Sequence, residues 1–414
     1  MKIKEQISKI KKSGFLSYFT ANVVYSLSTF LINLSLPKVL APQCFNEFIY
    51  LFQMVFFITT IAQFGMVVGL YKFLNEFRTK TYNIYYVLIL CINICLIILG
   101  LFNGNFVSSL LKLGELSFTE NLMFYISIII SGIYCFNKGK NVAEKAYKYM
   151  LRISLTVFIT RILLIIYLHF VPTTSISALF TLLFVVPFFQ DIKDYIVNSI
   201  KYISFKSIDT HLCKTFTTYC SKAWIIGVLF MISDKYFLIS TKDINAEFTI
   251  ALSFSAGFMG IISLFNNSFS NFFLSRLSSK DPISLFRYIV RLKKAALPYL
   301  ALLLIICTVF SAFVLLIYPS LGKITPVITF IVLFRAGFIA YLGQMSLLSK
   351  VLDLLNLEIS LNICRIAVVF FLCLLITPEH MLLWYVIIMF IIPFPEFVIA
   401  LVANHKVKTL VAKL

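Results

Sequence analysis

Three arginines lie inside stretches of sequence that are otherwise apolar: Arg161, Arg335 and Arg365. An arginine stays protonated at any relevant pH, and a charge at the centre of a membrane-spanning helix costs about 2.5–3.5 kcal/mol on insertion scales. Such a charge must therefore face water, a carboxylate or an anionic ligand. A planar guanidinium binds phosphate oxygens as a two-pronged fork, so arginines at this depth predict a ligand that carries phosphate.

Few carboxylates are available to neutralise these arginines. Asp234 and Glu396 are the only two that we place in the interior of apolar spans, away from their terminal residues. Either the charges pair internally and fix helix packing, or a surplus of positive charge remains for a ligand. Carboxylates inside a span can also bind a proton or a sodium ion, so both are candidates for ion coupling. Pairing with Lys235 or Lys222 is the alternative for them.

Amide side chains accompany the charged ones at helical spacing. Asn22 begins a polar series in the first span, and Asn267 belongs to a similar series in the eighth. This spacing places each series on one helix face, either as a packing surface of small residues or as the wall of a polar cavity. Asn362 lies one turn before Arg365. We predict that the substrate binds these three asparagines and the three arginines.

The sequence has no pattern typical of a catalytic or metal centre. Walker A, GxSxG and HExxH motifs are absent. The four histidines and nine cysteines are scattered without the spacing of metal ligands. We therefore expect no enzyme activity and no cofactor.

The composition requires membrane-spanning helices to carry these residues. The chain is 60% hydrophobic and 13% charged, with a mean hydropathy of +0.96, whereas soluble domains are about 45–50% apolar and about 25% charged. A transmembrane helix needs about 20 apolar residues, and such runs recur along the chain. We predict an all-α integral membrane protein with twelve transmembrane helices at 14–36, 47–71, 82–102, 121–137, 149–170, 175–191, 217–239, 247–274, 297–318, 326–348, 359–377 and 381–403.

The basic residues orient these helices. The N-terminal segment and every second connecting segment after it together hold 27 Lys and Arg residues. The connecting segments on the opposite side of the membrane hold four. Basic residues accumulate on the cytoplasmic side of membrane proteins, so both the N- and C-termini are predicted to be cytoplasmic. The net charge of +19 is then mostly a consequence of topology, and we exclude nucleic acid as a partner.

Two short patterns recur in the two halves of the chain. The motif I-x-R-I surrounds both Arg161 and Arg365, and the span that follows each motif contains a proline, Pro187 or Pro393. The two offsets, 204 and 206 residues, are close to half of the 414-residue chain. We predict two six-helix lobes, 1–206 and 207–414, related by an axis along the membrane normal and arranged around a central cavity.

Two segments at the start of the chain, "FTANVVYSLSTFLINLSLPKVLAPQCFNEF" and "IAQFGMVVGLYKF", resemble bacterial polysaccharide (O-antigen, Wzx-type) flippases. These belong to the multidrug/oligosaccharidyl-lipid/polysaccharide (MOP) exporter superfamily. The features that match are Asn22, Leu36-Pro37 and Phe64-Gly65, together with the segment that begins at Asp234. The sequence departs from the family pattern at "CFNEF" and "EF", before its second and eighth helices.

The resemblance implies a flippase that moves an undecaprenyl-diphosphate-linked oligosaccharide by alternating access. The cargo would be a repeat unit of O-antigen (lipopolysaccharide) or of a related surface polysaccharide. It would cross the phospholipid bilayer of the bacterial inner membrane, from the cytoplasmic to the periplasmic leaflet. A proton or sodium ion is the expected coupling ion, and a polysaccharide polymerase and a chain-length regulator are the expected protein partners.

Three alternatives remain at this point. A multidrug exporter of the same superfamily is expected to have an acidic, aromatic cavity, which the arginines disfavour. A membrane-embedded polysaccharide polymerase commonly has a large external loop, and the longest one expected here, 103–120, is modest. A flippase for cell-wall precursors usually has more helices than the twelve predicted.

Overall fold

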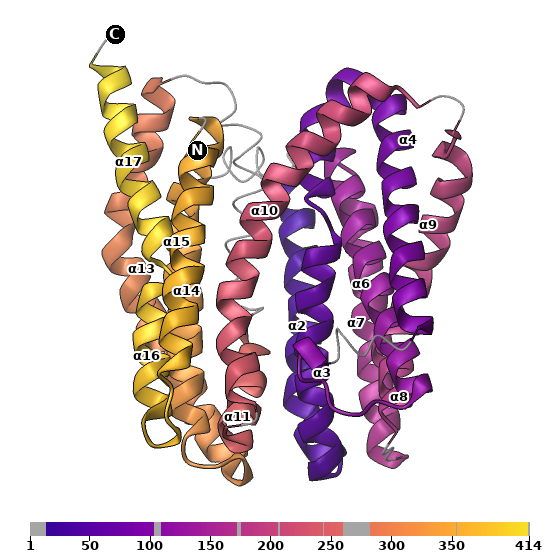
Figure 1. Ribbon diagram of the computed structural model, residues 1–414, viewed down its shortest axis with the longest axis vertical. Helices are drawn as coiled ribbons and strands as arrows, with labels where there is room; N and C mark the ends of the chain where they lie inside the picture. Colours follow the sequence, from indigo (N-terminus) through magenta and orange to yellow (C-terminus); the bar gives the residue numbers. More distant parts are fainter. Residues whose placement is uncertain are drawn as a thin grey trace, which may run out of the picture. The chain divides into compact units, whose positions relative to one another are not determined.

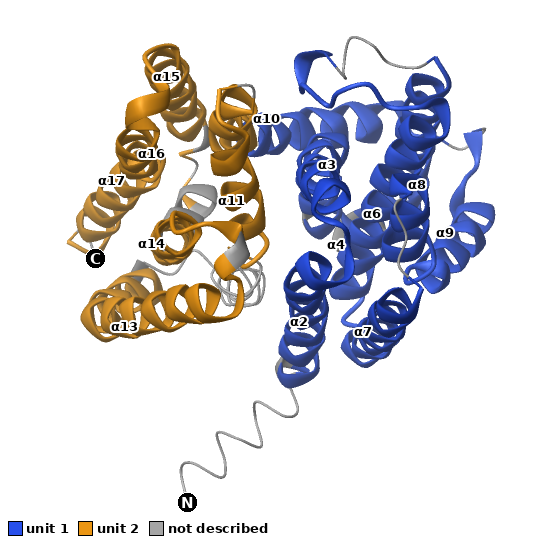
Figure 2. Ribbon diagram, turned by 90° about the horizontal axis from the view of Figure 1, so that it is seen from below, with its two compact units in different colours: residues 1–228 blue, residues 229–414 orange. Residues whose placement is uncertain are grey.

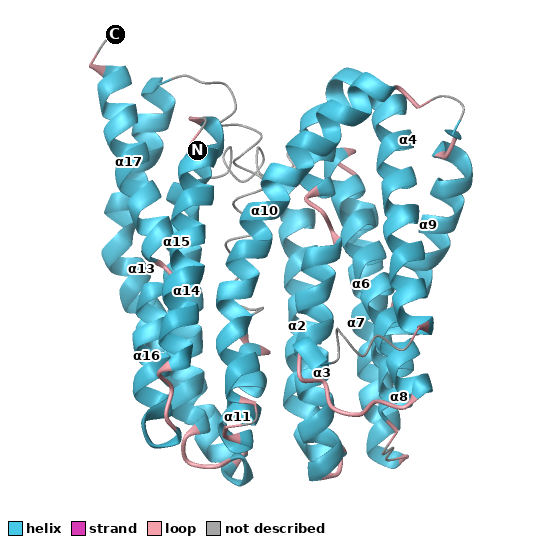
Figure 3. Ribbon diagram, viewed as in Figure 1, coloured by secondary structure: helices cyan, strands magenta, loops and turns pink. Residues whose placement is uncertain are grey.

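The computed structural model describes residues 14–102, 109–171, 175–205, 208–242, 244–259, 282–352 and 354–412. Within these ranges the regular elements are helices, and no strand occurs (Figure 3). Ten helices there are long and apolar enough to cross a membrane, and one bent pair makes an eleventh candidate. The predicted class, an all-α multi-pass membrane protein, is confirmed. The predicted span 247–274 begins as α11 (Ala246–Ala256) and continues into residues outside the described ranges.

The first compact unit comprises residues 1–228, called unit 1 below (Figure 2). Within it α2 packs along α7, and α6 packs against α3, α4, α8 and α9 (Figure 1). Its elements are α2 (Phe15–Val39), α3 (Pro42–Ala62), α4 (Met66–Leu101), α6 (Phe118–Ala143), α7 (Tyr147–Phe170), α8 (Ile176–Phe180), the π-helical turn η1 (Thr181–Val185), α9 (Phe189–Tyr202) and most of α10 (Thr210–Thr241).

The second compact unit comprises residues 229–414, called unit 2. Here α14 contacts α11, α13, α16 and α17, so it is the central helix of the unit. The structural boundary lies inside α10, whereas the predicted repeat boundary at 206/207 precedes that helix. After α11, the elements are α13 (Pro282–Ile317), η3 (Pro319–Leu321), α14 (Thr325–Val351), α15 (Leu355–Leu374), η4 (Pro378–His380), α16 (Met381–Ile391) and α17 (Phe394–Val411).

The break between the second and third helices lies earlier than predicted. Phe64 and Gly65 both adopt left-handed backbone angles, with φ of 47° and 62°, and α4 starts directly after them. A Cβ at Gly65 would overlap the backbone carbonyl of Cys220 in α10, so this tight passage requires glycine. The predicted loop at 72–81 is instead helical, apart from non-helical angles at Phe77. It contains no Gly or Pro that would end a helix.

Two predicted spans are broken at internal prolines, Pro187 and Pro393, whereas Pro298 lies inside the continuous helix α13 (Pro282–Ile317). The pair Ile176–Val185 and Phe189–Tyr202 bends by 64° around Pro187, after a π-helical turn closed by the Val186 N–H and the Thr181 carbonyl at 3.1 Å. The other span is interrupted between Ile391 and Phe394, next to Pro393. A proline inside a helix removes one N–H donor and clashes with the preceding turn, which accounts for both breaks.

Two helix starts also differ from the predicted boundaries. The predicted span 297–318 is part of a longer helix, α13, which the structure describes from Pro282 onward. The start of α10 is fixed by Asp209, whose carboxylate accepts hydrogen bonds from the Leu212 N–H and from Lys80, each at 3.0 Å. The Leu212 bond, followed by the Lys80 bond, holds the pKa of this carboxyl below its usual range.

Candidate functional site

Arg161 lies in the middle of α7 and is 1% exposed. Its Nη1 donates hydrogen bonds to Ser28 Oγ at 2.9 Å and Thr29 Oγ1 at 3.0 Å, both on α2. Its Nε and Nη2 are buried and meet no hydrogen-bond acceptor. Among the described residues no carboxylate forms an ion pair with it. Arg161 is therefore a buried cation with unused donors and no counter-charge in that part of the chain.

Aromatic rings surround this guanidinium. Its Cζ lies 5.3 Å from the ring centroid of Tyr25 and 5.0 Å from that of Phe188, just after the Pro187 break. Tyr25 stacks on Tyr134 of α6 with the centroids 4.5 Å apart, and Tyr134 contacts Phe188 at 5.1 Å. Ring faces carry negative partial charge and attract cations, so they compensate the arginine in part and leave its outer N–H groups open.

A second cation lies over the same stacked pair. The Lys138 ammonium is 5.9 Å from the Tyr25 centroid and 6.0 Å from the Tyr134 centroid, and it forms no ion pair among the described residues. The sequence analysis placed Lys138 in a cytoplasmic loop, but it belongs to α6 and is half-buried. Lys138 and the three rings were missed there. The available signal was the spacing of Tyr134 and Lys138, which are neighbours on one helix face.

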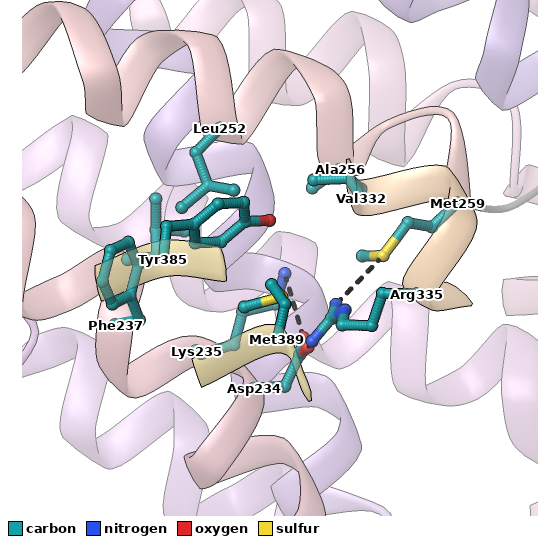
Figure 4. Close-up of a pocket in the computed structure, with 11 residues that line it drawn as sticks. Asp234, Lys235, Phe237, Leu252, Ala256, Met259, Val332, Arg335, Tyr385 and Met389 are labelled. Carbon is teal, nitrogen blue, oxygen red and sulfur yellow. Dashed lines mark hydrogen bonds and ion pairs between the residues drawn. The ribbon is translucent and has the colours of Figure 1, made fainter. Parts of the chain in front are cut away.

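Arg335 of α14 is paired within unit 2. Its Nη1 donates to Asp234 Oδ1, and its Nη2 lies 3.3 Å from Met259 Sδ. The Lys235 ammonium lies 3.8 Å from the other oxygen of Asp234, so one carboxylate serves two cations. Figure 4 shows these charges at one side of a small pocket, with Tyr385 and Leu252 among its lining residues.

Arg365 of α15 is paired as well. Its Nη1 donates to the Glu396 carboxylate at 3.0 and 3.3 Å and to the Ile392 carbonyl at 2.9 Å, and its Nη2 donates to Asn362 Oδ1. The guanidinium also lies 4.8 Å from the Phe230 ring centroid. Arg365 thus joins α15 to both sides of the break at Pro393.

Six of the eight residues predicted as substrate contacts or coupling carboxylates fall into three groups. Arg161 has no carboxylate partner in the part of the chain that the structure describes, whereas Arg335 pairs with Asp234 and Arg365 with Glu396. Asn362 belongs to the Arg365 group. Asn22 is 4% exposed on α2, and its amide donates to the Tyr18 carbonyl of its own helix at 3.1 Å. Asn267 lies outside the described residues.

Comparisons with known proteins address the fold. No protein-family model and no curated protein matches the sequence. Among solved structures, a MATE transporter in complex with MaL6 matches with a TM-score of 0.67 at 14% identity over 97% of this chain and 96% of that one. The lipid II flippase MurJ in an inward closed conformation matches with a TM-score of 0.65 at 14% identity, over 96% and 92% of the two chains.

An outward-facing multidrug resistance MATE transporter of the MOP superfamily is also similar, with a TM-score of 0.58 at 15% identity over 97% and 95% of the two chains. At such low identities a match demonstrates the fold alone. It covers nearly the whole of each chain, so the correspondence is not limited to one unit. The protein therefore has the helical fold shared by MATE transporters and by the lipid II flippase MurJ.

Proposed function

We propose that this protein is a flippase that moves an undecaprenyl-diphosphate-linked oligosaccharide from the cytoplasmic to the periplasmic leaflet of the bacterial inner membrane. Its fold is that of transporters, and the Wzx-type resemblance of the sequence suggests the cargo. The observation that carries the proposal is Arg161, a buried cation with two unused donor atoms and no carboxylate partner among the described residues.

The groups around Arg161 suit the two parts of such a cargo. A diphosphate is an anion that accepts several hydrogen bonds, and Arg161 and Lys138 would supply the positive charges for it. Tyr25, Tyr134 and Phe188 present flat apolar faces, and the two tyrosines add hydroxyl groups. A sugar ring has apolar faces and hydroxyl edges, so a saccharide fits beside such rings.

The guanidinium is closed to solvent in the present arrangement, being 1% exposed. Transport by alternating access therefore requires a rearrangement that opens this region. We assign Asp234 and Glu396 to neutralising Arg335 and Arg365. Those two arginines would reach an anionic cargo only after release from their carboxylates, so the proposal places the phosphate contact at Arg161.

A multidrug or cation exporter is the second candidate, because the MATE structures match as well as the flippase does. The charges favour the flippase. A cationic drug would meet Arg161 and Lys138 without a carboxylate in the described part of the site, and like charges repel. An aromatic site with two unpaired cations is better suited to an anion.

The experiment is complementation of a deletion in the native host, with lipid-linked saccharides analysed in each membrane leaflet. The deletion strain should accumulate completed repeat units on the cytoplasmic leaflet, and the wild-type gene should restore surface polysaccharide. Arg161→Met should fail to restore it, and Arg161→Lys should restore it in part, because lysine keeps the charge but loses the planar fork. Arg152→Met is the matched control, since Arg152 is an exposed cation of the same helix.

Two outcomes would contradict the proposal. Full restoration by Arg161→Met would remove the anion contact from the transport cycle. Unpolymerised repeat units reaching the outer leaflet of the deletion strain would instead indicate a polymerase. For each Arg161 variant, the amount of protein inserted in the membrane must equal that of the wild type.

A further inference from the structure

Asp191 lies one turn after the Pro187 break. Its buried carboxyl group has no part in the proposed binding of the cargo. Asp191, in the first turn of α9, is 1% exposed. The Asn137 amide of α6 donates to its backbone carbonyl at 2.8 Å and to its Oδ1 at 3.4 Å. Its Oδ2 is buried and has no hydrogen-bond partner. One oxygen of this carboxyl group is therefore available to carry a proton.

No cation compensates Asp191 among the described residues. It forms no ion pair there, so neither Arg161 nor Lys138 neutralises it in the present arrangement. From α4, Asn93 reaches α9 at the Tyr195 hydroxyl. The titratable groups that surround Asp191 are Tyr25 of α2, Tyr134 and Cys135 of α6, Tyr149 of α7 and Asp194 of α9 itself. An ionised carboxylate is costly in such surroundings, so this arrangement favours the protonated form.

The corresponding place in unit 2 is filled differently. Glu396 lies one turn after the Pro393 break, and Arg365 binds it and the carbonyl at that break. In unit 1, Arg161 binds hydroxyl groups instead, and the carboxyl group after the break has only an amide. The two units therefore share an arginine, a proline break and a carboxyl group, but the ion pair is formed in unit 2 alone.

We propose that Asp191 is a proton-binding site whose occupancy controls how strongly Arg161 and Lys138 bind an anion. Aromatic rings connect the three groups: the Arg161 guanidinium lies 5.0 Å from the ring of Phe188, one turn before Asp191, and both cations lie over the ring of Tyr25. When Asp191 releases its proton to water, it becomes a carboxylate that attracts these cations and competes with an anionic ligand. When it binds a proton, the cations are free for the ligand. Proton and anion then bind cooperatively, and the coupling is reciprocal.

The first measurement concerns the proton alone and does not depend on the proposed cargo. Infrared difference spectra of the purified protein, recorded across a pH titration, should contain a band of a buried protonated carboxyl group. That band should be absent in Asp191→Asn. It should persist in Asp194→Asn, the matched control on the same helix, because Asp194 accepts hydrogen bonds from Tyr149 of α7 and from Gln190 of α9. Identical spectra for the wild type and Asp191→Asn would overturn the assignment.

The second measurement concerns the coupling, which rests on the proposed anion site. Inorganic diphosphate is titrated into the wild type and into Asp191→Asn across the same pH range. The wild-type affinity should fall about tenfold relative to the variant as the carboxyl band disappears, within the usual range of coupling between sites. Diphosphate itself changes protonation with pH, but this affects its binding to both proteins equally. The ratio of the two affinities therefore removes that effect.

The possible outcomes distinguish three statements: that Asp191 binds a proton, that the proton is coupled to the anion, and that Arg161 and Lys138 bind an anion. A constant affinity ratio would overturn the coupling. A carboxyl band that titrates in a protein that binds no diphosphate at any pH would support the proton site, and it would overturn both the coupling and the anion site. A ratio that falls with the band supports all three.

Discussion

Arg161 and Arg365 have the same sequence motif around them but opposite electrostatic surroundings. Arg365 has a carboxylate, a side-chain amide and a backbone carbonyl as acceptors, whereas Arg161 has two hydroxyl groups and aromatic rings. Their cost to stability must therefore differ. An ion pair offsets part of the desolvation of a buried charge, and an unpaired charge keeps most of it.

This difference predicts opposite stability effects for the same substitution at the two positions. Arg365→Met would leave Glu396, whose side chain is only 13% exposed, without its cation, and breaking a buried pair costs about 3–5 kcal/mol. Arg161→Met removes a charge that has no carboxylate partner among the described residues, so stability should be unchanged or higher. Thermal and urea unfolding of the purified protein in detergent measures both. An equal loss in the two variants would contradict this account of Arg161.

At the residue scale, the sequence indicated which cations are buried but not what they contact. Arg335 and Asp234 are 101 positions apart, and no spacing rule connects residues so distant in the chain. The composition left two interpretations open, internal ion pairing and a surplus of positive charge. Among the described residues, Arg335 and Arg365 are paired with carboxylates and Arg161 is not. Asp191 was overlooked because its position at the end of a predicted span suggested solvent exposure.

Two kinds of break shape the helices that hold these residues. At Gly65 the chain turns within three residues, against the backbone of α10. At Pro187 a π-helical turn and a proline together bend the span beside Arg161. Hydropathy located most of the spans, because length and apolar content suffice for that. It could not locate the Gly65 break, which depends on a close approach to Cys220.

Gly65→Ala should destabilise unit 1. An L-residue with left-handed backbone angles costs roughly 1–2 kcal/mol, and the added methyl group would overlap the Cys220 carbonyl. Gly227→Ala in α10 is the control. A Cβ there meets no atom within 4 Å, and alanine is the better helix former. The unfolding temperature in detergent should fall for the first variant and stay or rise for the second. A fall of equal size in both would argue against the tight turn.

At the scale of the whole molecule, the sequence predicted an all-helical membrane protein, and the structure confirms it. The solved transporters that it matches share about 14–15% of residues with it, so the fold is preserved where the sequence is not. A membrane span tolerates exchange of one apolar residue for another, which explains this degeneracy. Because the apolar residues are interchangeable, information about a ligand can come only from the few polar side chains inside the spans.

The most direct test of the central claim, that an anionic lipid-linked saccharide is moved through a site containing Arg161, uses purified protein in liposomes. A fluorescent polyprenyl-diphosphate-linked saccharide is placed in one leaflet, and its arrival in the other is followed by chemical quenching. The wild type and Arg152→Met should move it at similar rates. Arg161→Met should be at least about tenfold slower, because losing a desolvated charge contact typically costs 2–5 kcal/mol. Movement by Arg161→Met at the wild-type rate would contradict the account.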